Sequence, residues 1–217
     1  IKRVLNALHI PVVTAENFEA DDILATLAHH SSIPVCILTG DRDSFQLIGD
    51  QVLVLYPGQR MSDLRHMDDA AVQEKYGVPA RRYRDLAALV GESSDNLPGV
   101  PGVGPKTAAK WIAQFGGLED ILAVADTIPG KAGEALREHA DQVRLNYELN
   151  RLVADVPIPT DLAAYAKHDY DPRDYHNVLD ELEFGRGDTS VRGRVLSAWP
   201  TATVDESPSP AASIDVA

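Results

Sequence analysis

The sequence predicts an α/β fold in which helices cover a parallel sheet. Three short apolar stretches rich in β-branched residues indicate strands, at residues 10–13, 35–39 and 52–56. Residues 22–29, between the first two stretches, have a helical pattern. A strand, a helix and a second strand in this order form a β-α-β unit, which is typical of a parallel sheet. We therefore expect the sheet in the first third of the chain.

The rest of the chain is predicted to be mainly helical. Apolar side chains recur with helical spacing in six further segments, at residues 1–8, 68–76, 81–90, 118–125, 131–154 and 175–182. A turn is expected at residues 184–187. From residue 197 onward Ser, Thr, Pro and Ala dominate, which favours a flexible tail at residues 197–217.

These patterns suggest a division into domains. We expect a sheet-containing core at residues 1–80 and a helical region at residues 81–190. Ile1 is neither an initiator Met nor preceded by a helix cap, so we expect that sequence upstream is missing and that residues 1–80 are the C-terminal part of the core.

Composition limits the possible functions. The net charge is −13, which argues against a protein that coats nucleic acid by bulk charge, so any such contact must be local or helped by metal ions. Cys36 is the only cysteine, which excludes a disulfide framework and a cysteine-based zinc site. No apolar run is long enough to span a membrane. A cytoplasmic protein is expected.

Acidic side chains cluster where predicted elements begin or end. Because neighbouring carboxylates repel one another, such clusters favour a hard cation with oxygen ligands, Mg²⁺ or Mn²⁺. Two such ions can activate a water and stabilise the leaving oxygen of a phosphodiester. The candidate catalytic and metal-binding residues are Glu19, Asp21, Asp22, Asp41, Asp43, Glu92 and Asp95.

Each cluster also has a purely structural interpretation. Asp21 or Asp22 could cap a helix, Asp41 and Asp43 could form a turn after Gly40, and Asp95 could begin an Asx turn. The three clusters together, the last leading into an anion-binding hairpin, favour a metal-dependent nuclease.

Residues 91–112 combine the last acidic cluster with a phosphate-binding pattern. Gly102, Gly104 and Ala108 form GxGxxxA, which permits close approach of a phosphate and tight helix packing. Pro105 suits the first helical position, and we expect free N–H groups at Lys106 and Thr107 beside the positive end of the helix dipole. The spacing is not that of a Walker A loop. A simple turn rich in Gly and Pro is the alternative.

In these residues the chain resembles the 5′ nucleases, the family of flap endonucleases and of the 5′-3′ exonuclease domain of bacterial DNA polymerase I. The resemblance covers about residues 1–185 and is carried by FEADD (18–22), LTGDRDSFQL (38–47), GESSDNLPGVPGVGPKTA (91–108) and LEFG (182–185). It implies a PIN-like parallel sheet with a helix-three-turn-helix, similar to a helix-hairpin-helix, that holds duplex DNA. Because LEFG is followed by a short tail, we expect a stand-alone bacterial nuclease.

The resemblance also implies roles for single residues. Glu19, Asp21 and Asp22 would serve one side of a metal cluster, and Asp41, Asp43 and Asp95 the other. The family usually has Asp at position 92 and Glu at position 105. Gly102, Gly104, Lys106 and Thr107 would contact DNA, with a K⁺ ion at the hairpin.

The implied activity is hydrolysis at 5′ ends or flaps of DNA in replication and repair, by a monomer that needs two or more divalent ions. Whether the substrate is a nick, a gap, a 5′ flap or an RNA primer end stays open. Two alternatives are a DNA-binding module with a degenerate active site and a PIN-type ribonuclease.

Overall fold

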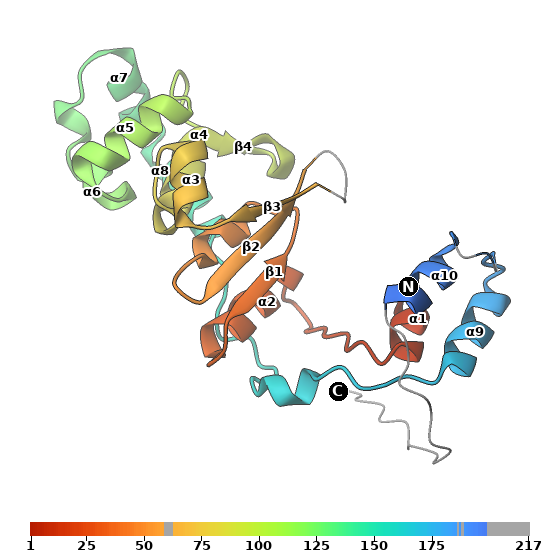
Figure 1. Ribbon diagram of the computed structural model, residues 1–217. Coiled ribbons are helices and arrows are strands. Elements are labelled where there is room, and N and C mark those ends of the chain that lie inside the picture. The colour runs from red at the N-terminus through yellow and green to blue at the C-terminus, as the bar shows by residue number, and fades with distance from the viewer. Residues whose placement is uncertain (59–62, 186, 188, 199–217) are drawn as a thin grey trace. The chain divides into compact units, whose positions relative to one another are not determined.

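The computed structural model describes residues 1–58, 63–185, 187 and 189–198, which form two compact units (Figure 1). The larger unit is Thr14–Leu162. The smaller unit combines Ile1–Val13 with the chain from Ala163 onward. No helix in the part of the chain that the structure describes is long and apolar enough to cross a membrane.

A three-stranded sheet lies in the larger unit. β1 (Val35–Leu38) pairs in parallel with β2 (Val52–Pro57), and β2 pairs antiparallel with β3 (Leu64–Met67). The strand order is β1-β2-β3. The predicted strands at residues 35–39 and 52–56 and their parallel arrangement are confirmed, whereas β3 was not predicted.

The predicted strand at residues 10–13 is wrong. These residues form no strand; they follow α1 (Lys2–Ala7), and the N–H of Ile10 donates to the carbonyl of Leu5 at 2.9 Å. Pro11 has no N–H for a sheet ladder, and a Pro within a short apolar run argues against a paired strand. The expected β-α-β unit is therefore replaced by α2 (Ala20–His30) leading into β1 alone.

Helices make up most of the larger unit. After the sheet come α3 (Asp69–Tyr76) and α4 (Tyr83–Val90), and then α5, α6 and α7 at one end of the unit (Figure 1). In the labels that follow, η denotes a short 3₁₀ helix. The elements that complete the larger unit are η1 (Asp43–Leu47), η2 (Ala80–Arg82), β4 (Gly91–Glu92), η3 (Ser93–Asp95), β5 (Leu97–Pro98), α5 (Pro105–Phe115), α6 (Leu118–Ala123), η4 (Ala125–Thr127), α7 (Gly130–Glu138) and α8 (Ala140–Leu149). A further 3₁₀ helix, η5 (Leu162–Tyr165), follows where the two units meet in sequence.

The helix predicted at residues 131–154 is too long and is in fact two helices. His139 lies between α7 and α8 with φ −112° and ψ 16°, outside helical values. The second helix ends at Leu149, because the residues beyond it hydrogen-bond to α2 and η1 instead of continuing the helix.

One hydrophobic core runs through the larger unit. It includes buried residues from Ile37 to Val143. Phe45, fully buried, contacts the rings of Tyr56, Tyr76 and Tyr83. Residues on both sides of residue 80 contribute to this core, and the predicted domain boundary there stays a prediction.

The smaller unit has a separate core. α1 packs against α9 (Pro172–Glu181), where Leu8, Tyr175 and Leu179 are buried. α10 (Val191–Ala198) was not predicted, and it contains the first two residues of the expected flexible tail. The rest of that tail, residues 199–217, and Arg186 in the predicted turn lie outside the described residues.

Candidate metal centre

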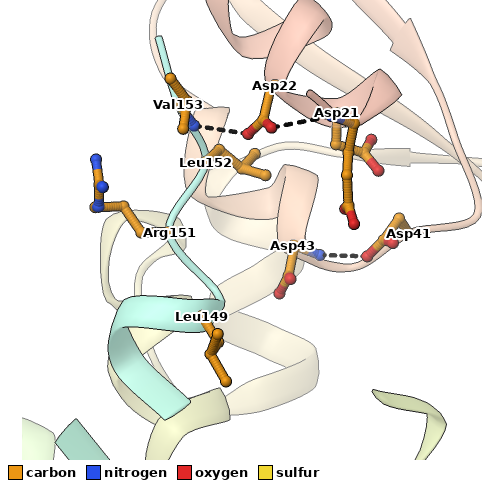
Figure 2. A pocket seen from close by; sticks show the side chains of 9 residues that line it. Asp21, Asp22, Asp41, Asp43, Leu149, Arg151, Leu152 and Val153 are labelled. Atoms are coloured by element: carbon orange, nitrogen blue, oxygen red, sulfur yellow. Dashed lines mark hydrogen bonds between the residues drawn. The ribbon is translucent and has the colours of Figure 1, made fainter. Parts of the chain in front are cut away.

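The first acidic cluster lies at the start of α2. Glu19 is the N-cap, and its N–H donates to Oδ2 of Asp22 at 3.1 Å. Oδ1 of Asp22 accepts the N–H of Val153 at 2.8 Å (Figure 2). Asp21 instead accepts the hydroxyl of Ser44 at 3.2 Å. The capping interpretation is therefore correct for Asp22, whereas Asp21 faces the second acidic cluster.

The second cluster follows β1 in a tight turn. The N–H of Asp41 donates to the hydroxyl of Thr39 at 3.0 Å, and the N–H of Asp43 donates to Oδ1 of Asp41 at 2.9 Å (Figure 2). Asp41 thus forms the turn that was the structural alternative for this pair. Oδ1 of Asp43 is buried and has no hydrogen-bond partner among the described residues. The turn therefore leaves one carboxylate oxygen free for a ligand.

The two clusters share one pocket of about 240 Å³. Acidic side chains line one side of it, and the residues after α8 line the other (Figure 2). The lining residues are Glu19, Asp21, Asp22, Asp41, Asp43, Leu149, Arg151, Leu152 and Val153.

The third cluster is carried by the short β4–β5 hairpin. Glu92 is only 6% exposed, and its Oε1 lies 3.3 Å from Nη2 of Arg42. Asp95 is exposed in η3 and accepts the hydroxyl of Ser94 at 3.3 Å. Asn96 follows with φ +58°, a left-handed conformation that Asn tolerates well. The hairpin thus brings Glu92 and Asp95 near the second cluster.

The clusters act on one another electrostatically. Burial raises the pKa of the Asp43 carboxyl to about 8, and the charges of Glu92, Asp41 and Asp95 add to the rise. Burial also raises the pKa of Asp21, with a further contribution from the charge of Asp41. All of the predicted acids thus belong to one region of high negative charge, in which a cation would relieve the repulsion.

The donor set suits a hard cation. Carboxylate oxygens are the ligands that Mg²⁺ and Mn²⁺ prefer, and the free oxygen of Asp43 is a ready ligand. Within the described residues, however, no three His, Cys, Asp or Glu side chains gather closely enough to hold one ion. The assignment of individual metal ligands therefore stays a prediction.

The predicted phosphate-binding hairpin begins α5. Pro105 occupies the first helical position, Gly104 is the N-cap, and Ala108 is fully buried, as its small side chain led us to expect. The N–H of Thr107 is not free, because it donates to the carbonyl of Gly104 at 3.0 Å. Lys106 is exposed. Its contact with DNA, like those of Gly102, Gly104 and Thr107, stays a prediction.

Two features of the site were missed. The first is the ion pair between Arg42 and Glu92. The position of Arg42 between Asp41 and Asp43 in the sequence was the signal that could have indicated it. The residues after α8 were assigned to a helix, and nothing local indicates that they line a pocket more than 100 residues away in sequence. We name residues 150–156 the strap, because they bind α2 and η1 through Thr26, Gln46 and Asp22.

Two sequence profiles match consecutive parts of the chain. Residues 1–77 match the profile described as "5′-3′ exonuclease, N-terminal resolvase-like domain". Residues 78–173 match "5′-3′ exonuclease, C-terminal SAM fold". Between them, the matches contain all three acidic clusters, the α5 hairpin and the strap.

Curated relatives carry related names. DNA polymerase I of Mycobacterium tuberculosis is 47% identical over 186 residues, which are 84% of this chain and 21% of the polymerase. The 5′-3′ exonuclease of Streptomyces coelicolor is 44% identical over 165 residues, which are 73% of this chain and 55% of that protein. The chain thus spans about a fifth of the polymerase and about half of the exonuclease.

Solved structures agree with these matches. T5 5′-exonuclease, described with bound divalent metal ions (zinc), has a TM-score of 0.56 and 26% identity, over 66% of this chain and 53% of that chain. The catalytic core of Rad2 in complex with DNA substrate has a TM-score of 0.56 over 83% of this chain and 62% of that chain. Its 18% identity makes this a likeness of fold. From its sequence profiles, relatives and fold, the chain belongs to the 5′-3′ exonuclease family.

Proposed function

We propose that this chain is a divalent-metal-dependent 5′-3′ exonuclease and flap endonuclease that hydrolyses phosphodiesters at 5′ ends or flaps of duplex DNA. The observation that carries the proposal is the environment of Asp43. Its carboxyl is buried beside three other carboxylates, its pKa is raised to about 8, and its Oδ1 has no hydrogen-bond partner in the described part of the chain. A protein stabilises such a cluster poorly by itself, so a cation is the expected partner.

We assign Asp21, Asp41, Asp43 and Asp95 to two or more metal ions, with Glu19 also lining the pocket. The related T5 5′-exonuclease is described with bound divalent metal ions, which supports this assignment. When bound, Mg²⁺ or Mn²⁺ would lower the pKa of a water and stabilise the leaving oxygen.

The chain's own residues hold the acids in place. The carboxylate of Asp41 fixes the backbone of Asp43, and the hydroxyl of Ser44 fixes Asp21. Through Val153 the strap is bound to Asp22, so the pocket keeps its opposite wall. These bonds set the positions of the carboxylates before a metal or a substrate arrives, which reduces the cost of reorganisation.

A second contact with DNA is assigned to the start of α5. Gly102, with φ +78°, and Gly104 have no atom within 4 Å of an added Cβ, so both leave room for a backbone phosphate. Lys106 would add a positive charge beside it. Arg84 is a poorer candidate, because its guanidinium already stacks on Tyr147 at 3.6 Å and hydrogen-bonds the carbonyl of that residue.

We also assign a K⁺ ion to the glycine-rich turn that begins α5. As substrates in replication and repair we assign nicks, gaps, 5′ flaps and RNA primer ends. The protein would act in the cytoplasm as a monomer. These finer assignments rest on the motifs and on the family.

A single assay tests the main proposal. A duplex with a 5′-labelled flap is incubated with Mg²⁺ or Mn²⁺, and the product ends are mapped with and without a chelator. Cleavage near the flap junction that is lost with the chelator and in Asp43→Asn is the expected result. Asp50→Asn, which changes an exposed acid outside the pocket, is the control. Metal-independent binding without cleavage would instead indicate a DNA-binding module.

A further inference from the structure

We propose that Glu92 is a positioning residue and not a metal ligand: its carboxylate is held by Arg42, and this ion pair joins the Asp41–Asp43 turn to the hairpin that carries Asp95. The inference deepens the proposed function and rests on it only for its metal-binding test. It rests on three structural observations, which concern the burial of Glu92, its contact with Asp43 and the rigidity of the hairpin.

The first observation is the environment of Glu92. The residue is 6% exposed, and Oε1 lies 3.3 Å from Nη2 of Arg42, whose side chain is 40% exposed. A buried carboxylate is costly unless a counter-charge or hydrogen bonds stabilise it. Arg42 supplies that counter-charge, and Tyr83, Tyr76 and Tyr56 are its other electrostatic neighbours.

The second observation is the contact between Glu92 and Asp43. The carboxyl of Asp43 donates a hydrogen bond to the carboxylate of Glu92, and this bond adds to the rise of the pKa of Asp43. Glu92 thus binds both Arg42 and the carboxyl of Asp43, as a residue that positions a ligand does.

The third observation is the rigid backbone that carries Glu92. In the hairpin Gly91 lies opposite Pro98 and Glu92 opposite Leu97. A Cβ on Gly99 would meet the carbonyl oxygen of Val90 at 1.9 Å, so the strands approach as closely as glycine allows.

The side chain of Asn146 binds the β4–β5 hairpin to the helix before it. Asn146 is fully buried, and its side-chain amide donates to the carbonyls of Pro98 at 2.8 Å and Ala88 at 3.1 Å. A hairpin held in this way keeps the backbone of Glu92 in a fixed place beside Arg42.

A double-mutant cycle in the metal-free chain tests the pair. Arg42→Gln, Glu92→Gln and the double variant are unfolded in urea with a chelator present. We expect the double variant to lose less stability than the sum of the single variants, by at least about threefold in the unfolding equilibrium constant. Arg42→Lys should recover part of the loss, because it keeps the charge.

The matched control is the exposed pair of Arg144 and Glu119, 3.4 Å apart. Its cycle should show almost no interaction, because exposed ion pairs are weak. If Arg42→Gln does not fold, the comparison of Arg42→Lys with Glu92→Gln replaces it. Additive losses in the Arg42 and Glu92 cycle would overturn the proposal.

Binding of Mn²⁺, followed by electron paramagnetic resonance, separates the two roles of a carboxylate. Glu92→Gln should lower Mn²⁺ affinity by about 10- to 100-fold, the usual cost of losing a partner of a ligand, and Asp43→Asn should lower it further. Equal losses in the two variants would make Glu92 a ligand and overturn the proposal. If the unchanged chain binds no Mn²⁺, the proposed function fails, and the unfolding cycle alone decides the role of Glu92.

Discussion

The backbone N–H of Val153 donates to Oδ1 of Asp22 at 2.8 Å, although the two residues are 131 positions apart in sequence. The other oxygen of Asp22 accepts the N–H of Glu19 at 3.1 Å. Asp21, the next residue, instead accepts a side-chain hydroxyl and lies close to other acids. These two neighbouring carboxylates on one helical turn thus have different roles. Asp22 accepts hydrogen bonds from two backbone N–H groups, whereas Asp21 faces the other acids of the pocket.

This difference predicts unequal effects of alanine. Asp22→Ala leaves two backbone N–H groups without their acceptor and should lower the free energy of unfolding by about 2 kcal/mol. Asp21→Ala removes a charge that other acids repel and should change it by less than about 1 kcal/mol. Urea unfolding with a chelator present measures both. Equal destabilisation by the two variants would contradict the division of roles.

Asp43 predicts a pH dependence of stability in the metal-free chain. Its pKa rises from the ordinary value of 3.8 to about 8 on folding, so between these values the folded chain keeps a proton that the unfolded chain has lost. Its contribution to stability is therefore complete below pH 3.8 and declines as the pH approaches 8. Asp43→Asn should remove this decline and stabilise the chain more at pH 8 than at pH 4.

Urea unfolding across this pH range, again with a chelator, checks the effect of Asp43. Asp50→Asn is the control, because Asp50 is exposed and lies outside the pocket. Parallel pH profiles for Asp43→Asn and the unchanged chain would show that the carboxyl of Asp43 does not have the raised pKa.

Gly104, at the start of α5, and Gly99, after β5, are predicted to differ in their tolerance of alanine. Gly104 has φ −98° and nothing within 4 Å of an added Cβ, so Gly104→Ala should fold normally. If a phosphate approaches there, the methyl group should still weaken duplex binding by at least about threefold. Gly99→Ala should destabilise the fold by more than about 2 kcal/mol, because its Cβ would meet a carbonyl oxygen at 1.9 Å. Unchanged duplex affinity in Gly104→Ala would favour a simple turn.

Lys106 predicts a uniform effect on DNA binding. A contact with phosphate carries no base information, so Lys106→Ala should weaken binding to all duplex sequences alike and reduce the slope of log affinity against log salt by about 1. Fluorescence anisotropy over a range of salt concentrations measures this slope. Lys2→Ala, on α1, is the control and should leave the slope unchanged. A loss that depends on the duplex sequence would exclude a purely phosphate contact.

Local patterns predicted the elements whose burial is regular and missed those that depend on distant partners. β1 and β2 are apolar and form where expected, whereas β3 contributes only Met67 to the core and pairs because it folds back on β2. Residues 10–13 looked like a strand by composition alone, but Pro11 cannot complete a ladder.

The site was predictable to a similar extent. The acids could be located because each cluster lies at the end of an element, where a turn or a helix cap exposes carboxylates. The pair of Arg42 with Glu92 and the wall formed by the strap could not be predicted, because both join segments that are far apart in sequence. The packing of α8 against α4 and the hydrogen bonds to α2 and η1 together bring the strap to the pocket.

Phe45 links the chemistry of the pocket to residues that never touch it. It follows Asp43 by two positions in η1, and its ring rests on Tyr56, Tyr76 and Tyr83, which belong to β2, α3 and α4. The position of η1, and with it that of Asp43, thus depends on aromatic rings from three separate elements. Truncation of any one of these rings would leave a cavity beside Phe45, so the site is open to damage from residues that contribute no ligand.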